Sequence, residues 1–327
     1  MKQEIKFCST SEGVNIAYSA VGKGPSIVKA ANWLNHLELD WSSPVWSHWL
    51  SEFTRGLQLV RYDQRGTGLS DRKVTDLSLD AFVDDLHTVV EALKLDRFPV
   101  LAISQGGPVA IAYAIKYPEK VSHLVIYGSF ATGWKKSNLS GREVEKREAQ
   151  LALIKQGWDS KNPAIRQLFT TTCLPNGTAE EHNSFNELQL QSVSGKNAAA
   201  IFEALGEIDV FDRLPEVSMP TLVLHSKDDA LVPFEEGRRM ASHIPNARFV
   251  PLESPNHLLL QHEPAWTEFV SEVNNFLDRP NYESQRPGYL MVCPKCDRTF
   301  TADLLFCLDD GERLANIGDV DPATLIR

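Results

Sequence analysis

The first 128 residues alternate between short apolar runs and stretches with helical spacing of apolar positions. Residues 5–18 alternate around a Ser-Glu-Gly turn, which predicts an antiparallel hairpin. Apolar positions three or four apart predict a helix at residues 79–95, with Ser78 as its N-cap. Continuous apolar runs predict buried strands at residues 26–30, 58–62, 100–103 and 121–128. This alternation predicts an α/β fold with a mostly parallel sheet and helices on both faces.

The pattern changes over residues 129–213, where charges cluster and the apolar residues take helical spacing throughout. An all-helical insert between two strands predicts a cap above the sheet, which would shape a pocket and exclude water. The alternative is a helical excursion packed elsewhere.

The strand and helix pattern resumes after the insert, in strands at residues 221–225 and 248–252 and helices at 235–244 and 265–277. The domain boundaries expected from these changes are a core in two parts (1–128 and 214–279), the cap (129–213), a polar linker with proline and glycine (280–288) and a tail (289–327).

Ser104 lies where the apolar run at residues 100–103 gives way to a second helical stretch. Its neighbours at ±2 are Ala102 and Gly106, and both are small. A strand-to-helix turn this tight strains the serine backbone and exposes its hydroxyl above the sheet, as in a nucleophile elbow. Ordinary turn chemistry is the alternative for a serine before two glycines.

A nucleophilic serine needs a general base and a group that orients the base. Asp229 follows the strand at 221–225, and His257 follows the strand at 248–252. Ligands of parallel sheets bind at these strand ends. The order serine, acid, histidine along the chain is the one found in hydrolases whose serine lies on such an elbow. The predicted triad is therefore Ser104, Asp229 and His257.

Glycines at positions 66 and 68 follow the strand at residues 58–62 and could suggest a phosphate loop. The segment lacks the P-loop lysine and does not open directly into a helix. It is predicted to be a structural turn in which Asp63 and Arg65 form local hydrogen bonds.

Composition narrows the class of protein. The 327 residues are 43% hydrophobic and carry a formal net charge of −10, which supports a large core and argues against nucleic-acid or anionic-membrane binding. The absence of a 20-residue apolar run or an apolar leader predicts a cytoplasmic protein with no membrane partner. Five cysteines, an odd number, do not suggest a disulfide framework.

Residues 5–278 resemble the serine α/β-hydrolase superfamily, in particular a bacterial branch found alone or fused to nucleotide-cyclase and LuxR-type regulator domains. The segments that carry the resemblance are residues 33–41, 61–71, 103–107, 206–210 and 232–239. The resemblance implies a carboxylesterase-like enzyme that needs no cofactor and acts on a small or medium apolar ester through an acyl-enzyme. A haloalkane dehalogenase or epoxide hydrolase would need a carboxylate at position 104. The rival is a small-molecule receptor with slow or no turnover in bacterial signalling.

In this fold the loop after the first buried strand and the residue after the nucleophile donate two backbone N–H groups to the oxyanion. Trp33 and Gln105 hold these positions here. The residues expected to line the substrate pocket are Trp33, Leu34, Phe130, Trp134 and Leu258.

The tail resembles a zinc ribbon. Cys293 and Cys296 form one knuckle, and Cys307 with Asp310 forms a second that departs from the usual pair of cysteines. Three thiolates and one carboxylate can hold structural zinc in a tetrahedral site. The alternative is a ribbon that has lost its metal and keeps its shape through apolar contacts. Seven acidic residues against four basic ones make a nucleic-acid partner unfavourable and leave a protein partner as the expected contact.

Overall fold

The computed structural model describes residues 3–278, 290–293, 295, 299–301 and 315–316, and the chain divides into two units, Met1–Val273 and Asn274–Arg327. The first unit is built on an eight-stranded sheet in the order β1-β2-β4-β3-β5-β6-β7-β8. Its strands are β1 (Ile5–Ser9), β2 (Asn15–Gly22), β3 (Ser26–Lys29), β4 (Gln58–Tyr62), β5 (Phe98–Ile103), β6 (Val121–Tyr127), β7 (Thr221–Ser226) and β8 (Arg248–Leu252). The hairpin strands pair antiparallel and β3 to β8 pair in parallel, so the predicted mostly parallel sheet is confirmed.

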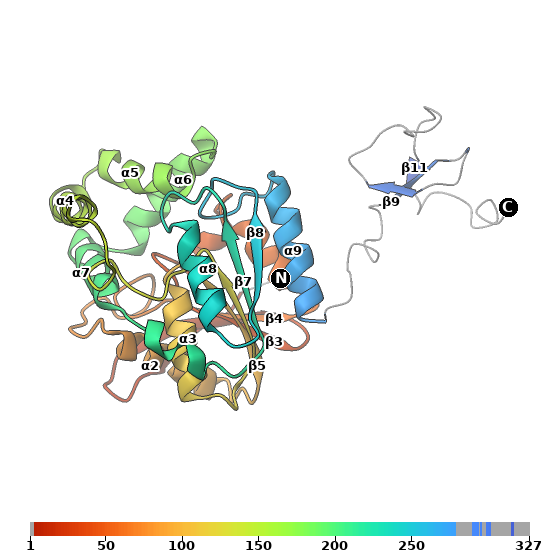
Figure 1. Ribbon diagram of the computed structural model, residues 1–327, viewed down its shortest axis with the longest axis horizontal. Coiled ribbons are helices and arrows are strands. Elements are labelled where there is room, and N and C mark those ends of the chain that lie inside the picture. The colour runs from red at the N-terminus through yellow and green to blue at the C-terminus, as the bar shows by residue number, and fades with distance from the viewer. Residues whose placement is uncertain (1–2, 279–289, 294, 296–298, 302–314, 317–327) are drawn as a thin grey trace. The chain divides into compact units, whose positions relative to one another are not determined.

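Helices cover the sheet on both faces (Figure 1). They are α1 (Ser47–Phe53), α2 (Leu79–Ala92), α3 (Gly106–Lys116), α8 (Phe234–His243) and α9 (Pro264–Phe276). On one face α1 meets α9, where the rings of Trp49 and Phe269 lie 4.8 Å apart. On the other, α2 packs beside α3 and their apolar residues join those of the strands in one core cluster. Burial of both sheet faces explains why the central strands read as continuous apolar runs.

The insert between β6 and β7 is helical, as its spacing predicts. It contains α4 (Gly141–Gly157), α5 (Ala164–Cys173), α6 (Ala179–Ser192) and α7 (Gly195–Glu207), and the 3-10 turn η2 (Phe211–Glu216) leads back to β7. A second such turn, η1 (Leu39–Trp41), precedes α1. Figure 1 shows α4 to α7 gathered on one side of the sheet. Ser140 and Thr178 begin α4 and α6 with capping boxes, which satisfy the first backbone N–H groups of each helix.

Local signals place the helix boundaries well. Ser78 caps α2 by accepting the Ala81 N–H over 3.2 Å, as predicted, although the helix ends at Ala92 rather than at residue 95. The prediction of local hydrogen bonds for Arg65 is wrong. Its side chain instead bonds to Asp85 on α2, with 2.8 Å between Nε and Oδ1, because the turn folds back onto this helix.

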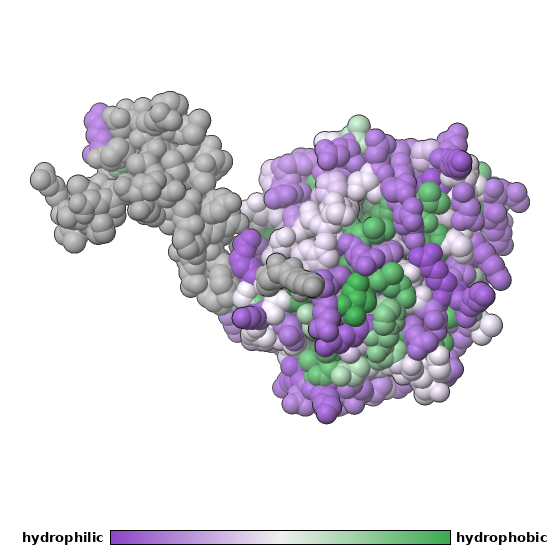
Figure 2. All heavy atoms as spheres, turned by 180° about the vertical axis from the view of Figure 1, so that it is seen from behind, coloured by the Kyte–Doolittle hydropathy of each residue, from purple (hydrophilic) through white to green (hydrophobic). Residues whose placement is uncertain are grey.

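The described part of the second unit contains a three-stranded antiparallel sheet in the order β10-β9-β11. Its strands are β9 (Leu290–Val292), β10 (Thr299–Thr301) and β11 (Ala315–Asn316). No helix among the described residues is long and apolar enough to span a membrane. Hydrophilic residues cover most of the face of the first unit shown in Figure 2, around a hydrophobic patch.

Candidate active site

Ser104 occupies the turn between β5 and α3 in a left-handed conformation, with φ +53°. The backbone of any residue other than glycine is strained in this conformation, so surrounding contacts must hold the turn in place. The Ser104 N–H donates to the Tyr127 carbonyl over 2.9 Å. The Ser129 hydroxyl donates to the Ser104 carbonyl over 2.6 Å. These bonds fix the strained turn to the end of β6.

Two glycines let α3 approach its surroundings closely. A Cβ on Gly107 would lie 1.8 Å from the Ser129 hydroxyl oxygen, the same hydroxyl that holds the turn. A Cβ on Gly106 would lie 3.2 Å from the Ala31 carbonyl oxygen, in the loop after β3. The Ser104 turn and that loop are thus in direct contact.

The structure brings Asp229 and His257 together. Nδ1 of His257 lies 2.7 Å from Oδ2 of Asp229, and both residues are buried. The other carboxylate oxygen accepts the N–H groups of Leu231 and Val232 over 2.8 and 3.0 Å. Burial acts to raise the pKa of Asp229, but the charge and hydrogen bond of His257, with the Val232 N–H, outweigh it and hold that pKa below its ordinary value.

His257 also lies beside the end of β6. A Cβ on Gly128, the residue after Tyr127, would lie 3.3 Å from Cε1 of the imidazole. Because Tyr127 accepts the Ser104 N–H, the serine and the imidazole flank the same strand end. In the described part of the chain, Nε2 of His257 is buried without a hydrogen-bond partner, which leaves it able to accept a proton.

A second imidazole, which sequence reasoning missed, lies beside the same carboxylate. Nε2 of His225, at the end of β7, is 3.6 Å from Oδ2 of Asp229 and 2.9 Å from the Val232 carbonyl. Burial lowers the pKa of His225 and so favours the neutral ring. Because a carbonyl oxygen only accepts, Nε2 carries a proton and donates it to Val232. A histidine four positions before the predicted acid was the available signal.

The predicted oxyanion donors come from the two segments that meet at Gly106. Within the described residues, neither the Trp33 N–H nor the Gln105 N–H has an acceptor in hydrogen-bonding geometry. The Gln105 side chain donates to Oε1 of Gln64 over 2.9 Å, which ties it to the turn after β4. Leu34, in the loop after β3, has φ +56° and is a second strained residue of the site.

The predicted pocket residues fall into two groups. The first group lies at a hydrophobic cluster formed by the apolar faces of α4, α5 and α7. Leu34 belongs to this cluster, and Trp33 and Trp134 pack against it. The Trp33 ring lies 6.0 Å from the ring of Trp158 and 6.2 Å from that of Phe202. The second group lies outside this cluster. Phe130 is half-buried and follows Gly128 by two residues, and the buried Leu258 directly follows His257.

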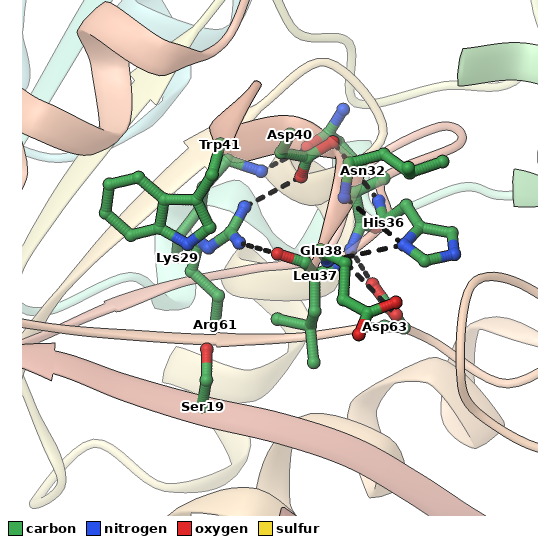
Figure 3. A network of polar contacts seen from close by, with 12 residues as sticks. Ser19, Lys29, Asn32, His36, Leu37, Glu38, Asp40, Trp41, Arg61 and Asp63 are labelled. Carbon is green, nitrogen blue, oxygen red and sulfur yellow. Dashed lines mark hydrogen bonds and ion pairs between the residues drawn. The ribbon is translucent and has the colours of Figure 1, made fainter. Parts of the chain in front are cut away.

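A buried polar cluster behind the loop was also missed (Figure 3). Arg61 donates to Asp40 over 2.7 Å. Burial lowers the pKa of Lys29 to about 7 and raises that of Asp63 to about 7. A lysine within the apolar run at residues 26–30 was the signal for this cluster.

Of the predicted zinc ligands, Cys296, Cys307 and Asp310 lie outside the described residues. Cys293 is buried, and the Lys295 N–H donates to its sulfur over 3.4 Å.

The fold agrees with a comparison against known families. The profile of the alpha/beta hydrolase fold matches residues 34–264, more than half of the chain, and the chain belongs to this family.

Individual relatives are more distant. The chain is 28% identical to a protein of Rhizobium rhizogenes named "Putative carbamate hydrolase RutD" over 244 residues, which cover 72% of this chain and 88% of the relative. It is 25% identical to the pyrrolizixenacetamide deacetylase of Xenorhabdus hominickii, over 80% of this chain and 94% of that protein. Among solved structures, the esterase EaEST from Exiguobacterium antarcticum has the same fold, with a TM-score of 0.73 and 23% identity over 84% of this chain and 99% of the esterase.

Proposed function

We propose that the protein is a serine hydrolase that cleaves small or medium, largely apolar esters through an acyl-enzyme. The observation that carries the proposal is the strained Ser104 turn beside the buried pair of Asp229 and His257. Strain at a tight turn, together with an imidazole oriented by a carboxylate, is the arrangement that activates a serine hydroxyl.

In this mechanism Ser104 attacks the substrate carbonyl while Nε2 of His257 takes its proton. Asp229 holds Nδ1 of the imidazole, fixes its tautomer and stabilises the imidazolium that forms. The N–H groups of Trp33 and Gln105 bind the oxyanion. His257 then protonates the leaving group and activates a water that releases the acid.

The aromatic cluster around Trp33 supports an apolar acyl group, because α4, α5 and α7 turn apolar side chains toward this loop. We propose that these helices form a cap over the serine. The His257 N–H donates to the carbonyl of Cys173 at the end of α5 over 2.8 Å, which joins the insert to the site.

Steady-state kinetics on p-nitrophenyl acetate, butyrate and octanoate, with an N-aryl carbamate and an acetanilide beside them, tests the proposal. The relatives named for carbamate and amide chemistry make the last two substrates a necessary comparison. We expect ester turnover that Ser104→Ala reduces by about 10⁴-fold or more. Ligand binding without turnover of any substrate would instead favour the receptor alternative.

We also propose that the tail holds a structural zinc ion through Cys293, Cys296, Cys307 and Asp310. The hydrogen bond from the Lys295 N–H to the Cys293 sulfur supports this assignment, because backbone N–H groups commonly orient and stabilise metal-bound ligands. Such an ion would fold the tail and take no part in the ester chemistry.

A further inference from the structure

Two buried side chains connect β3 to the loop that carries the predicted oxyanion donor. Nζ of Lys29 donates to Oδ1 of Asn32, and Nδ2 of Asn32 donates to the Trp33 carbonyl over 3.2 Å. Lys29 and Asn32 are labelled in Figure 3, and only 4% and 3% of their surfaces are exposed. Nζ of Lys29 also lies 4.9 Å from the centre of the Trp46 ring, which closes the space around it.

We propose that Lys29 and Asn32 are positioning residues that hold Trp33 so that its N–H points at the oxyanion. The inference rests on the proposed hydrolase function and deepens it. In this proposal neither side chain contacts the substrate. Both act through the backbone of Trp33.

Lys29 decides which way the Asn32 amide faces. An amide has an oxygen that accepts and a nitrogen that donates, and exchange of the two would abolish the bond to the Trp33 carbonyl. An ammonium has donors only, so it fixes the Asn32 oxygen toward itself and the Asn32 nitrogen toward Trp33. A neutral Lys29 amine could still donate to that oxygen, but its lone pair could also accept from the Asn32 nitrogen, so the charged form is the one that fixes the amide.

The loop needs such a device because it is strained. Leu34, the next residue after Trp33, has φ +56°, a conformation that persists only where neighbours over-determine it. On the far side of Leu34, the Asn35 amide donates to the carbonyl of Tyr62 over 2.8 Å and to Oδ1 of Asp63 over 2.7 Å. The strained residue is therefore held between two asparagine amides, and the Asn32 amide is the one next to the donor.

The rest of the polar cluster braces the loop farther along. Oδ1 of Asp40 accepts the His36 N–H over 3.2 Å, and Arg61 donates to the Leu37 carbonyl over 2.9 Å. None of these bonds reaches Trp33, so the effect of the Asn32 amide on the Trp33 carbonyl can be tested separately.

Asn32→Asp is the sharpest test. The aspartate has the shape of asparagine and still accepts from Lys29, but it cannot donate to the Trp33 carbonyl. We expect kcat on p-nitrophenyl butyrate to fall about 10- to 100-fold, with KM within about twofold, because a misplaced oxyanion donor weakens the transition state more than substrate binding. The midpoint of urea unfolding should fall no further than in the control variant below, since both exchanges remove a buried amide donor.

Asn197→Asp is the matched control. Asn197 is also buried, and its amide donates to the carbonyls of Gly66 and Arg72 over 2.9 and 2.8 Å, neither of which belongs to the loop that carries Trp33. This variant should lower the unfolding midpoint and leave kcat unchanged. A purely structural role for Asn32 would give the same result at both positions.

A double-mutant cycle tests the connection to Lys29. Lys29→Met and Asn32→Ala should each lower kcat, and the double variant should be no slower than Asn32→Ala, since both act through one hydrogen-bonded chain. Unchanged kcat in Asn32→Asp, or multiplied losses in the double variant, would overturn the inference. Ester turnover that survives Ser104→Ala would instead overturn the proposed function itself.

Discussion

Asp228 and Asp229 are adjacent in sequence and lie in opposite environments. Asp228 is exposed, whereas Asp229 is buried, bonded to His257 and held by two backbone N–H groups. A carboxylate that orients an imidazole must be desolvated and fixed in place, and only Asp229 meets that condition.

The pair of variants Asp229→Asn and Asp228→Asn tests this assignment. Asp229→Asn should lower kcat by about 10³- to 10⁴-fold, because the amide cannot stabilise the imidazolium and favours the wrong tautomer. Asp228→Asn, an equal change of charge one residue away, should stay within about twofold. The reverse ranking in ester kinetics would transfer the role to Asp228.

The three residues of the predicted triad could be chosen from the sequence alone, because the strand ends and the order of serine, acid and histidine are visible there. The second imidazole at His225 and the Lys29–Asn32 contact were not found. A buried polar residue in an apolar run shows that a partner is needed, but not which distant or neighbouring group provides it.

The turn between β5 and α3 requires a residue without a side chain at position 107. Gly107 lies against Ser129, whose hydroxyl donates to the Ser104 carbonyl, so any Cβ at position 107 must displace that hydroxyl. Gly141, the first residue of α4, has no atom within 4 Å of the corresponding position.

Gly107→Ala should therefore destabilise the protein by about 1–3 kcal/mol, the usual cost of overpacking. Gly141→Ala should be neutral or stabilise it by up to about 1 kcal/mol, because alanine favours the helical conformation. Urea unfolding of both variants measures the difference. Equal free energies of unfolding would show that the turn tolerates a side chain.

Elements themselves were predicted well because their signals are local. β4 has the predicted bounds, and α2 has the predicted cap at Ser78. Contacts between elements were less accessible: the bond from Arg65 to Asp85 joins residues twenty positions apart, and only the folded arrangement of turn and helix brings them together.

On the scale of the whole molecule, buried histidines make stability depend on pH. On α1, Nε2 of His48 donates to the Leu259 carbonyl over 3.0 Å, and the ring packs on that of Trp266 and is 7% exposed. Burial lowers its pKa to about 4 from 6.5. Between these values the unfolded chain binds the proton and the folded one does not, so stability falls as pH drops from about 6.5 to about 4.

His48→Gln should remove this part of the pH dependence. The unchanged protein should lose up to about 3 kcal/mol more than the variant between pH 7 and pH 4, as an upper limit from the shift in pKa. Urea unfolding at pH 7, 5.5 and 4 gives the comparison, and the difference between the two proteins cancels the contributions of other titrating groups. Parallel curves would mean that His48 binds its proton equally well in the folded and unfolded states, which contradicts the lowered pKa.

The tail should behave as a separate metal-dependent unit. A segment of about 40 residues has too small a core to fold well without a staple. Elemental analysis should find about one zinc per chain, and Cys296→Ser should lose it. A chelator should expose residues 289–327 to proteolysis while ester turnover persists. Zinc-free protein with a protected tail would exclude the metal, and turnover lost with zinc would mean that the tail supports the active site.

The most direct test of the account is covalent labelling of the full chain by a fluorophosphonate, followed by intact mass and peptide mapping. The account predicts one adduct per chain on Ser104, none in Ser104→Ala, and much slower labelling in His257→Ala because the base is gone. An adduct on another residue, or ester turnover by protein that remains unlabelled, would contradict the assignment of Ser104 as the nucleophile.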